Sequence, residues 1–237
     1  MAAFEKGIGA GAAGVELDIW RCGSGELVVV HDESVPGLGS ISHLSLESIR
    51  RFNGQIPTLK EVLVGLPSSV INIEIKSSKR DSRLSNGHPV LDSLVALLGE
   101  TSNRHRLVFS TFDRQIASQL PRLSAFGSAA LLTRIGTNTK SAIDFAVANG
   151  IGALHLPKDK VSPRSLKAIE KAGLSFSVWT VDDPREIEEM LRAGAALLIT
   201  NNVGAAVALA ETEIWLDVPG VAPVNGGIPS RTCLTRH

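Results

Sequence analysis

The stretch GVELDIW, residues 14–20, alternates apolar and acidic side chains in the manner of a strand. Successive side chains of a strand point to opposite faces, so Glu16 and Asp18 share one face and the aliphatic residues share the other. Two carboxylates side by side on a buried face are costly unless a cation or hydrogen bonds satisfy them. The stretch therefore predicts a buried strand whose acidic face has a function.

A second stretch, VINIEIK (70–76), repeats this pattern. Its isoleucines share one face, whereas Asn72, Glu74 and Lys76 share the other. In both stretches the acids lie toward the carboxyl end of the strand, where α/β barrels carry their active sites. Together with the two acids of the first stretch, Glu74 completes an all-oxygen set that suits Mg²⁺ or Ca²⁺. The structural alternative is that these acids pair with lysine or arginine inside the barrel.

Strand-like runs of this kind recur along the chain. They lie at residues 14–20, 70–76, 106–111, 128–133, 153–157, 175–181 and 196–202. The amphipathic segments between them often begin at Ser or Asp beside Pro and end at Gly, as helices do. Strands that alternate with helices predict βαβ units and a parallel sheet.

A closed barrel needs eight strands, and these runs provide seven. A helix-like segment, residues 2–12, precedes the first run with no strand before it. We therefore expect an α/β fold, a (β/α)8 TIM barrel whose first strand is missing from this chain; an open seven-stranded sheet is the alternative. Residues 1–211 would form the barrel domain. Residues 212–237 are rich in Pro and Gly without a period, which predicts an irregular tail.

Two histidines, His31 and His155, lie in apolar runs of the predicted barrel. His31 and Asp32 end the apolar run LVVVHD (27–32), and a histidine close to a metal suits general acid or base catalysis. His155 alternates with leucines in the run 153–157, and we expect it to be a hydrogen-bonded core histidine.

The composition limits the partners of this chain. Its 237 residues carry 24 basic and 24 acidic side chains, which gives no support for a nucleic-acid or anionic-membrane partner. Two cysteines form no disulfide framework, and no apolar run approaches the roughly 18 residues of a membrane span. The N-terminus lacks the features of a signal peptide, so we expect a soluble, cytoplasmic protein. The sequence predicts no oligomeric state.

In their order along the chain, these motifs resemble the glycerophosphodiester phosphodiesterase family of TIM barrels. The similarity runs through GVELDIW, LVVVHD, IPTLKEVL, INIEIK, FSTFD, SVWTVDD and AGAALLITNN, and it covers residues 1 to about 210. The resemblance implies that Glu16, Asp18 and Glu74 are ligands of a divalent metal. It also implies that His31 is one of two catalytic histidines.

The same resemblance implies a reaction and two substrate-binding residues. Lys76 matches a lysine near the substrate phosphate, and Trp179 matches an aromatic residue over the glycerol moiety. The family hydrolyses glycerophosphodiesters to glycerol 3-phosphate and an alcohol, so the expected partner is a small-molecule glycerophosphodiester.

One departure from the family pattern leaves alternatives open. The family begins with a His-Arg-Gly segment on its first strand, which supplies the second catalytic histidine, and this sequence lacks it. A catalytically impaired fragment or a pseudoenzyme that keeps the fold is therefore one alternative. A sphingomyelinase D-like phospholipase on a related barrel is another, although Glu74 and Lys76 match the glycerophosphodiesterase pattern better.

Overall fold

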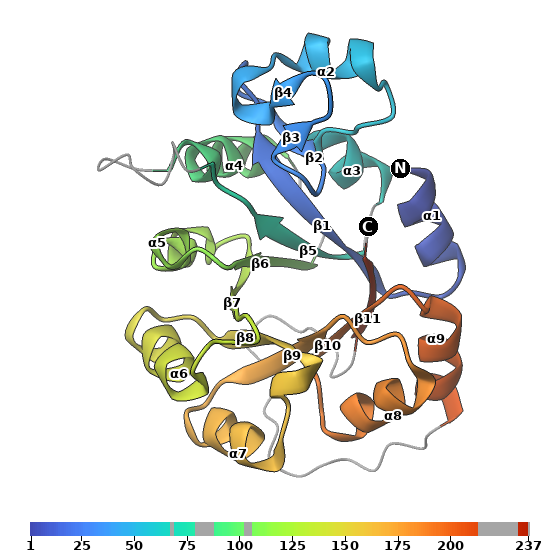
Figure 1. The fold of residues 1–237 in the computed structure, drawn as a ribbon, viewed down its shortest axis with the longest axis vertical. Helices are drawn as coiled ribbons and strands as arrows, with labels where there is room; N and C mark the ends of the chain where they lie inside the picture. Colours follow the sequence, from blue (N-terminus) through green and yellow to red (C-terminus); the bar gives the residue numbers. More distant parts are fainter. Residues whose placement is uncertain (67–68, 79–87, 102–105, 213–231, 237) are drawn as a thin grey trace.

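Eight parallel strands form a closed ring at the centre of the molecule (Figure 1). The computed structural model describes residues 1–66, 69–78, 88–101, 106–212 and 232–236. In ring order the strands are β1 (Gly14–Arg21), β5 (Val70–Ile75), β6 (Arg106–Thr111), β7 (Gly127–Leu132), β8 (Ala153–Pro157), β9 (Ser175–Trp179), β10 (Leu197–Thr200) and β11 (Thr232–Arg236). The predicted TIM barrel is confirmed.

Strand β11 occupies the ring position for which the sequence analysis found no strand. It pairs in parallel with β10 on one side and with β1 on the other, with Leu234 opposite both Ile199 and Gly14. Residues 232–236 thus differ from the predicted irregular tail, while residues 213–231 lie outside the described part of the chain. If β11 were absent, strand β10 and the first half of β1 would each present an unpaired edge. An extended segment can pair with such an edge whatever its hydrophobic pattern.

One edge of β1 is shared by two strands. Its first half pairs with β11, and its second half pairs in antiparallel fashion with β2 (Leu27–Val29), where Val29 lies opposite Ile19. The backbone N–H of Val30 then donates to the carbonyl oxygen of Asp18 at 3.1 Å. The end of β2 therefore meets β1 directly beside the acidic face.

Helices surround the ring (Figure 1). They are α1 (Ala2–Gly9), α4 (Pro89–Glu100), α5 (Arg114–Ala117), α6 (Thr139–Ala148), α7 (Pro163–Lys171), α8 (Pro184–Arg192) and α9 (Val203–Thr212), with 3₁₀ turns η3 (Leu120–Leu123) and η4 (Lys158–Lys160). The predicted caps explain where several begin: the side chains of Ser162 and Asp183 accept backbone hydrogen bonds at the starts of α7 and α8. No described helix has the length and apolar character that crossing a membrane requires.

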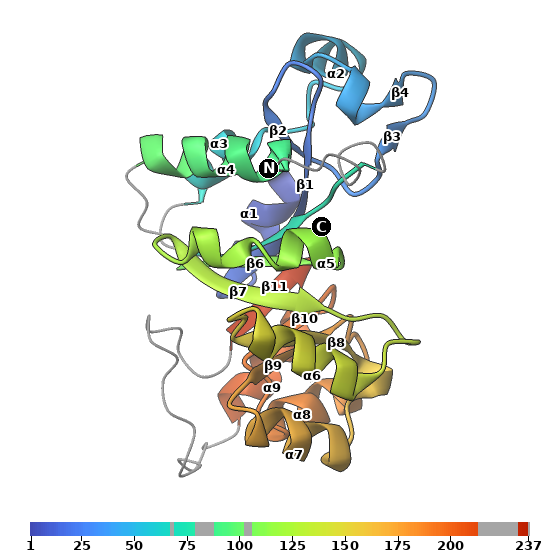
Figure 2. The same ribbon diagram turned by 90° about the vertical axis from the view of Figure 1, so that its left-hand side faces the viewer.

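The segment between β1 and β5 builds a small lobe at one end of the molecule (Figures 1 and 2). Besides β2 it contains β3 (Ser34–Val35), β4 (Gly39–Ser40), η1 (Ile41–His43), α2 (Leu46–Phe52) and α3 (Leu59–Gly65). A cluster of its own stabilises it, made of Trp20, Cys22, Val28, Val35, Ile41 and Ile49. A capping box between Thr58 and Glu61 fixes the start of α3, which packs against the barrel.

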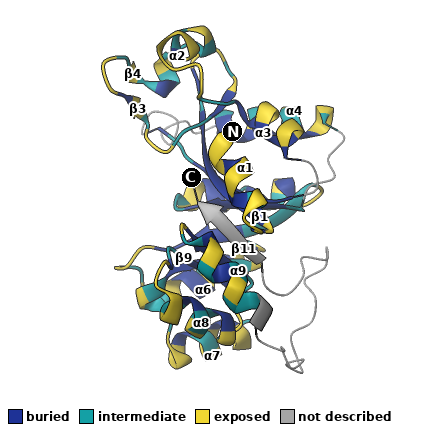
Figure 3. Cartoon of the chain, turned by 90° about the vertical axis from the view of Figure 1, so that its right-hand side faces the viewer, coloured by how far each residue is buried: buried dark blue, intermediate teal, exposed yellow. Residues whose placement is uncertain are grey.

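The two faces of each barrel strand have different roles. The outward aliphatic residues, such as Leu17, Ile73 and Val178, are fully buried beneath the helices (Figure 3). Inside the ring, an apolar layer that includes Val70, Val108, Ala130, Leu197 and Ile199 is packed together. The interior is thus filled with side chains, and the acidic residues lie further toward the carboxyl ends of the strands.

Candidate active site

Three buried carboxylates meet at the carboxyl end of the barrel. Register places Asp18 of β1 directly beside Glu74 of β5, with Glu16 two residues earlier on the same face of β1. One carboxylate oxygen from each residue lies within 4.8 Å of the other two. The three residues are 1–3% exposed. The strand alternation seen in the sequence therefore brings the predicted metal ligands together.

The Lys76 ammonium is the counter-charge within this cluster. Its Nζ lies 3.0 Å from Asp18 Oδ1 and also forms an ion pair with Glu74 Oε1. Burial by itself would lower the pKa of Lys76, but the charges of Glu74 and then Asp18 outweigh it, so the pKa is raised. Lys76 is therefore a permanent cation here.

The Lys76 ammonium pairs with two of the three buried carboxylates. Burial raises the pKa of Glu74 to about 7; the Lys76 charge opposes this rise, and the neighbouring Asp18 charge adds to it. Like charges held together in a low-dielectric site favour the uptake of a further cation. The close approach of Asp18 and Glu74 therefore favours a further cation beside Lys76.

Asn72 provides a separate sign that a ligand belongs in this site. It lies beside Glu16 in register and is fully buried, yet neither atom of its side-chain amide has a hydrogen-bond partner among the described residues. Buried amides are almost always hydrogen-bonded. With an all-oxygen donor set and an unpartnered amide beside it, Glu16, Asp18 and Glu74 fit a hard divalent cation.

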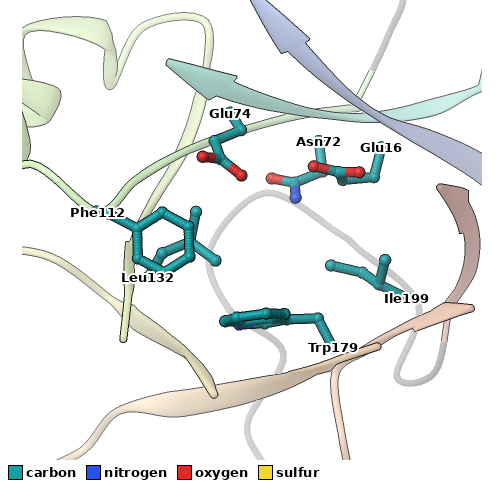
Figure 4. A pocket seen from close by; sticks show the side chains of 7 residues that line it. All are labelled: Glu16, Asn72, Glu74, Phe112, Leu132, Trp179 and Ile199. Atoms are coloured by element: carbon teal, nitrogen blue, oxygen red, sulfur yellow. The ribbon is translucent and has the colours of Figure 1, made fainter. Parts of the chain in front are cut away.

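A pocket with two chemically different walls opens above the cluster (Figure 4). It is lined by Glu16, Asn72, Glu74, Phe112, Leu132, Trp179 and Ile199 and encloses about 260 Å³ of empty space, open solvent included. Carboxylates and the amide lie on one side, and aromatic and aliphatic side chains lie on the other. Phe112 and Trp179 meet edge to face with ring centroids 5.6 Å apart, and Trp179 Nε1 donates to the His155 carbonyl oxygen at 3.3 Å. The indole is thus fixed in the apolar wall.

Comparison with known proteins identifies the family of this chain. The glycerophosphoryl diester phosphodiesterase family matches residues 1–205. The chain belongs to this family.

Relatives of known sequence and structure agree with the assignment. A glycerophosphodiester phosphodiesterase of Caldanaerobacter subterraneus subsp. tengcongensis is 28% identical over 219 residues, which are 85% of this chain and 87% of the relative. The crystal structure of a glycerophosphodiester phosphodiesterase from Thermotoga maritima has a TM-score of 0.71 at 27% identity and covers 88% of this chain and 90% of its own. A phosphodiesterase of Oleispira antarctica, solved with sn-glycerol-3-phosphate, shares the fold with a TM-score of 0.74 at 17% identity, covering 89% and 90%.

His31, the catalytic residue suggested by the family resemblance, lies near the cluster but is not part of it. Among the described residues it is not on the pocket lining, and its side chain is 58% exposed. Its Nδ1 lies 2.8 Å from Asp32 Oδ1, and it follows Val30, whose N–H binds the backbone of Asp18. This places the backbone before His31 beside the carboxylate cluster, and the role of His31 remains a prediction.

The sequence analysis missed two residues that shape the site. Phe112 lies within the FSTFD motif, but no role was assigned to it, and it proves to be the centre of an aromatic and cationic group. The guanidinium carbon of Arg134 lies 4.3 Å from the centroid of its ring, and Lys76 Nζ lies 5.9 Å from it. Arg134 directly follows a strand-like run, and no motif marks it.

His155 differs from its expected environment. It is fully buried, as predicted for a core histidine, but neither of its ring nitrogens has a hydrogen-bond partner among the described residues. Burial lowers its pKa to about 4. His155 is therefore a neutral histidine at ordinary pH.

Proposed function

We propose that this family member hydrolyses glycerophosphodiesters to glycerol 3-phosphate and an alcohol, with Mg²⁺ or Ca²⁺ held by Glu16, Asp18 and Glu74. The observation that carries this proposal is the group of three buried carboxylates, two of them paired with Lys76, which faces an open pocket. Such a group gains stability from a divalent cation and gives that cation access to a ligand.

The two walls of the pocket support a glycerophosphodiester as the ligand. Its phosphate would lie toward the cation side, while its glycerol carbons would contact Phe112 and Trp179 on the apolar side. The Oleispira antarctica protein, which shares this fold, was solved with the product sn-glycerol-3-phosphate.

Positive charge is the main contribution of this site to the reaction. When bound, the divalent cation would stabilise negative charge that develops on the phosphoryl oxygens. Lys76, held in place by Asp18 and Glu74, adds a second positive charge beside it. The edge-to-face pair of Phe112 and Trp179 forms an apolar surface on the opposite side.

We assign proton transfer to His31. Its Nδ1 is engaged by Asp32, so Nε2 remains to face the substrate. In its protonated form, His31 would donate the Nε2 proton to the oxygen of the leaving alcohol as a water oxygen bonds to phosphorus and the bond from phosphorus to the leaving oxygen breaks. The attacking water would give up a proton to solvent. The ring is solvent-exposed and the preceding Val30 is bonded to the backbone of Asp18, which supports this role.

The experiment is release of glycerol 3-phosphate from glycerophosphocholine, measured with Mg²⁺, with Ca²⁺ and with EDTA. We expect turnover with metal, none with EDTA, and a loss of about 100-fold or more in Glu16→Gln. Glu170→Gln, which makes the same change on the exposed face of α7, should match the wild type. Unchanged turnover in EDTA would contradict metal dependence, and no turnover under any condition would leave a pseudoenzyme. A lysophospholipid substrate, tested in parallel, separates this activity from that of a sphingomyelinase D-like enzyme.

A further inference from the structure

Arg134 extends the apolar wall of the pocket outward. It lies two residues after Leu132 of the pocket lining, and its guanidinium stacks on Phe112, another lining residue. The side chain is exposed, whereas Leu132 is buried. The stacking therefore holds a positive charge at the outer rim of the pocket, on the same ring that Lys76 approaches from the cluster.

The backbone around Arg134 is held at both ends. The Thr133 N–H donates to the carbonyl oxygen of His155 at 2.9 Å, which continues the pairing of β7 with β8. The Arg134 N–H donates to Thr137 Oγ1 at 3.0 Å, and the Thr137 N–H donates back to the Arg134 carbonyl oxygen at 2.9 Å. These bonds form a tight turn that fixes the direction in which the side chain leaves the strand.

The guanidinium of Arg134 has no acidic partner in the described part of the chain. Its recorded contact there is the face of Phe112. Other arginines of the surface, such as Arg50 and Arg122, form ion pairs with carboxylates. Lys76 is likewise committed to Asp18 and Glu74. Within the described residues, Arg134 is thus a cation beside the pocket that remains available to an anionic ligand.

A phosphodiester is a monoanion, and a cation at the rim of the pocket would attract it. A guanidinium presents two parallel N–H donors that match two phosphate oxygens, and it keeps its charge at every physiological pH.

We propose that Arg134 binds the phosphate group of the substrate and of the glycerol 3-phosphate product. This inference rests on the proposed function, because the ligand is the anion of that reaction. It adds a substrate-binding residue from the turn after β7 to the carboxylates of β1 and β5. The Phe112 ring positions both Arg134 and, through Trp179, the apolar wall against which the glycerol part lies.

Two substitutions separate this role from simple packing on Phe112. Arg134→Met keeps a long apolar chain over the ring but removes the charge, whereas Arg134→Lys keeps the charge. We expect KM for glycerophosphocholine and Ki for glycerol 3-phosphate to rise about tenfold or more in Arg134→Met, with a smaller change in kcat and with Arg134→Lys between the two. Lys171→Gln, at the far end of α7, removes one positive charge as a control and should change neither constant.

The outcomes distinguish this inference from the proposed function. If the wild type turns over and Arg134→Met performs as well as Arg134→Lys, Arg134 is a packing residue and the proposed function stands. If the wild type does not turn over, the test is the affinity of the wild type and of Arg134→Met for glycerol 3-phosphate, measured by calorimetry in the presence of Mg²⁺. Binding that weakens about tenfold in Arg134→Met would support the assignment, and equal binding, or no binding to the wild type, would overturn it.

Discussion

Lys76 Nζ lies 3.0 Å from Asp18 Oδ1, so a side chain of the protein already supplies positive charge at the predicted metal site. The same ammonium is paired with Glu74. A divalent cation and Lys76 would therefore compete for the negative charge of the same carboxylates, and the two cations would repel each other at short range. This competition leads to the first prediction.

Replacing Lys76 with Gln should tighten the binding of Ca²⁺ and Mg²⁺ while slowing turnover. Two charges 4 Å apart interact by roughly 4 kcal/mol at a partly buried site, so Lys76 should repel a bound cation appreciably. Because each 1.4 kcal/mol is a factor of ten, removing this charge should raise the affinity for the metal about tenfold or more. Isothermal titration with Ca²⁺ measures it. The metal-free variant should also lose roughly 3–5 kcal/mol of stability, because buried carboxylates lose their partner. Unchanged or weaker affinity would show that the metal and Lys76 do not share these oxygens.

Replacing His31 with Gln should affect turnover and little else. Because the side chain is 58% exposed and its recorded side-chain partner is Asp32, the free energy of unfolding should change by less than about 0.5 kcal/mol. The loss of a general acid should lower kcat by roughly 10²- to 10⁴-fold. Steady-state kinetics and a Ca²⁺ titration test both parts, since metal affinity should remain that of the wild type. A kcat within twofold of the wild type would remove His31 from the reaction.

Introducing proline at residue 234 should destabilise the barrel. Strand β11 is paired on both sides, and proline is tolerated in sheets essentially at edges and bulges because it lacks the N–H. Leu234→Pro should cost roughly 2 kcal/mol or more, whereas Leu234→Val, which keeps the N–H, should cost less. Urea unfolding of the two variants measures the difference. Equal midpoints would mean that the ring does not depend on β11.

Replacing His155 with Leu should flatten the pH dependence of stability. The pKa of His155 is about 4 in the folded protein and about 6.5 when unfolded, so the unfolded chain binds more protons between these values. Stability of the wild type therefore falls as pH drops from 6.5 toward 4, by on the order of 3 kcal/mol from this residue. Urea unfolding at pH 7.5 and pH 5 should show a smaller drop for His155→Leu. Identical drops would mean that His155 gains a partner or solvent before unfolding.

Much of this fold is predictable from the sequence because alternation has a direct physical meaning. The runs GVELDIW and VINIEIK place carboxylates on one face and aliphatic residues on the other, and these faces become the site and the outer core. Adjacent strands in parallel register then bring Asp18 beside Glu74 without any further information. The helix caps at Ser162 and Asp183 are equally local, and so they too are readable in advance.

The features that the sequence did not predict depend on contacts between distant segments. The segment TCLTR becomes β11 because β10 and β1 offer it two edges, not because its own pattern is that of a strand. Arg134 gains significance because Phe112, from another strand, lies beneath its guanidinium. The missing hydrogen bonds of His155 likewise depend on which side chains surround it inside the ring. None of these relationships has a signature at a fixed spacing along the chain.

The pairing of Gly14 with Leu234 also has a consequence for the order of folding. Strand β1 waits for a partner that the ribosome makes some 220 residues later, so the ring cannot be completed until that segment has been made. Contacts between such distant segments form slowly because a long loop must close first. During that interval β1 and β10 would have exposed edges, at which a nascent chain is most prone to aggregate. Yield in cells should therefore depend on chaperones more strongly than the stability of the finished protein would suggest.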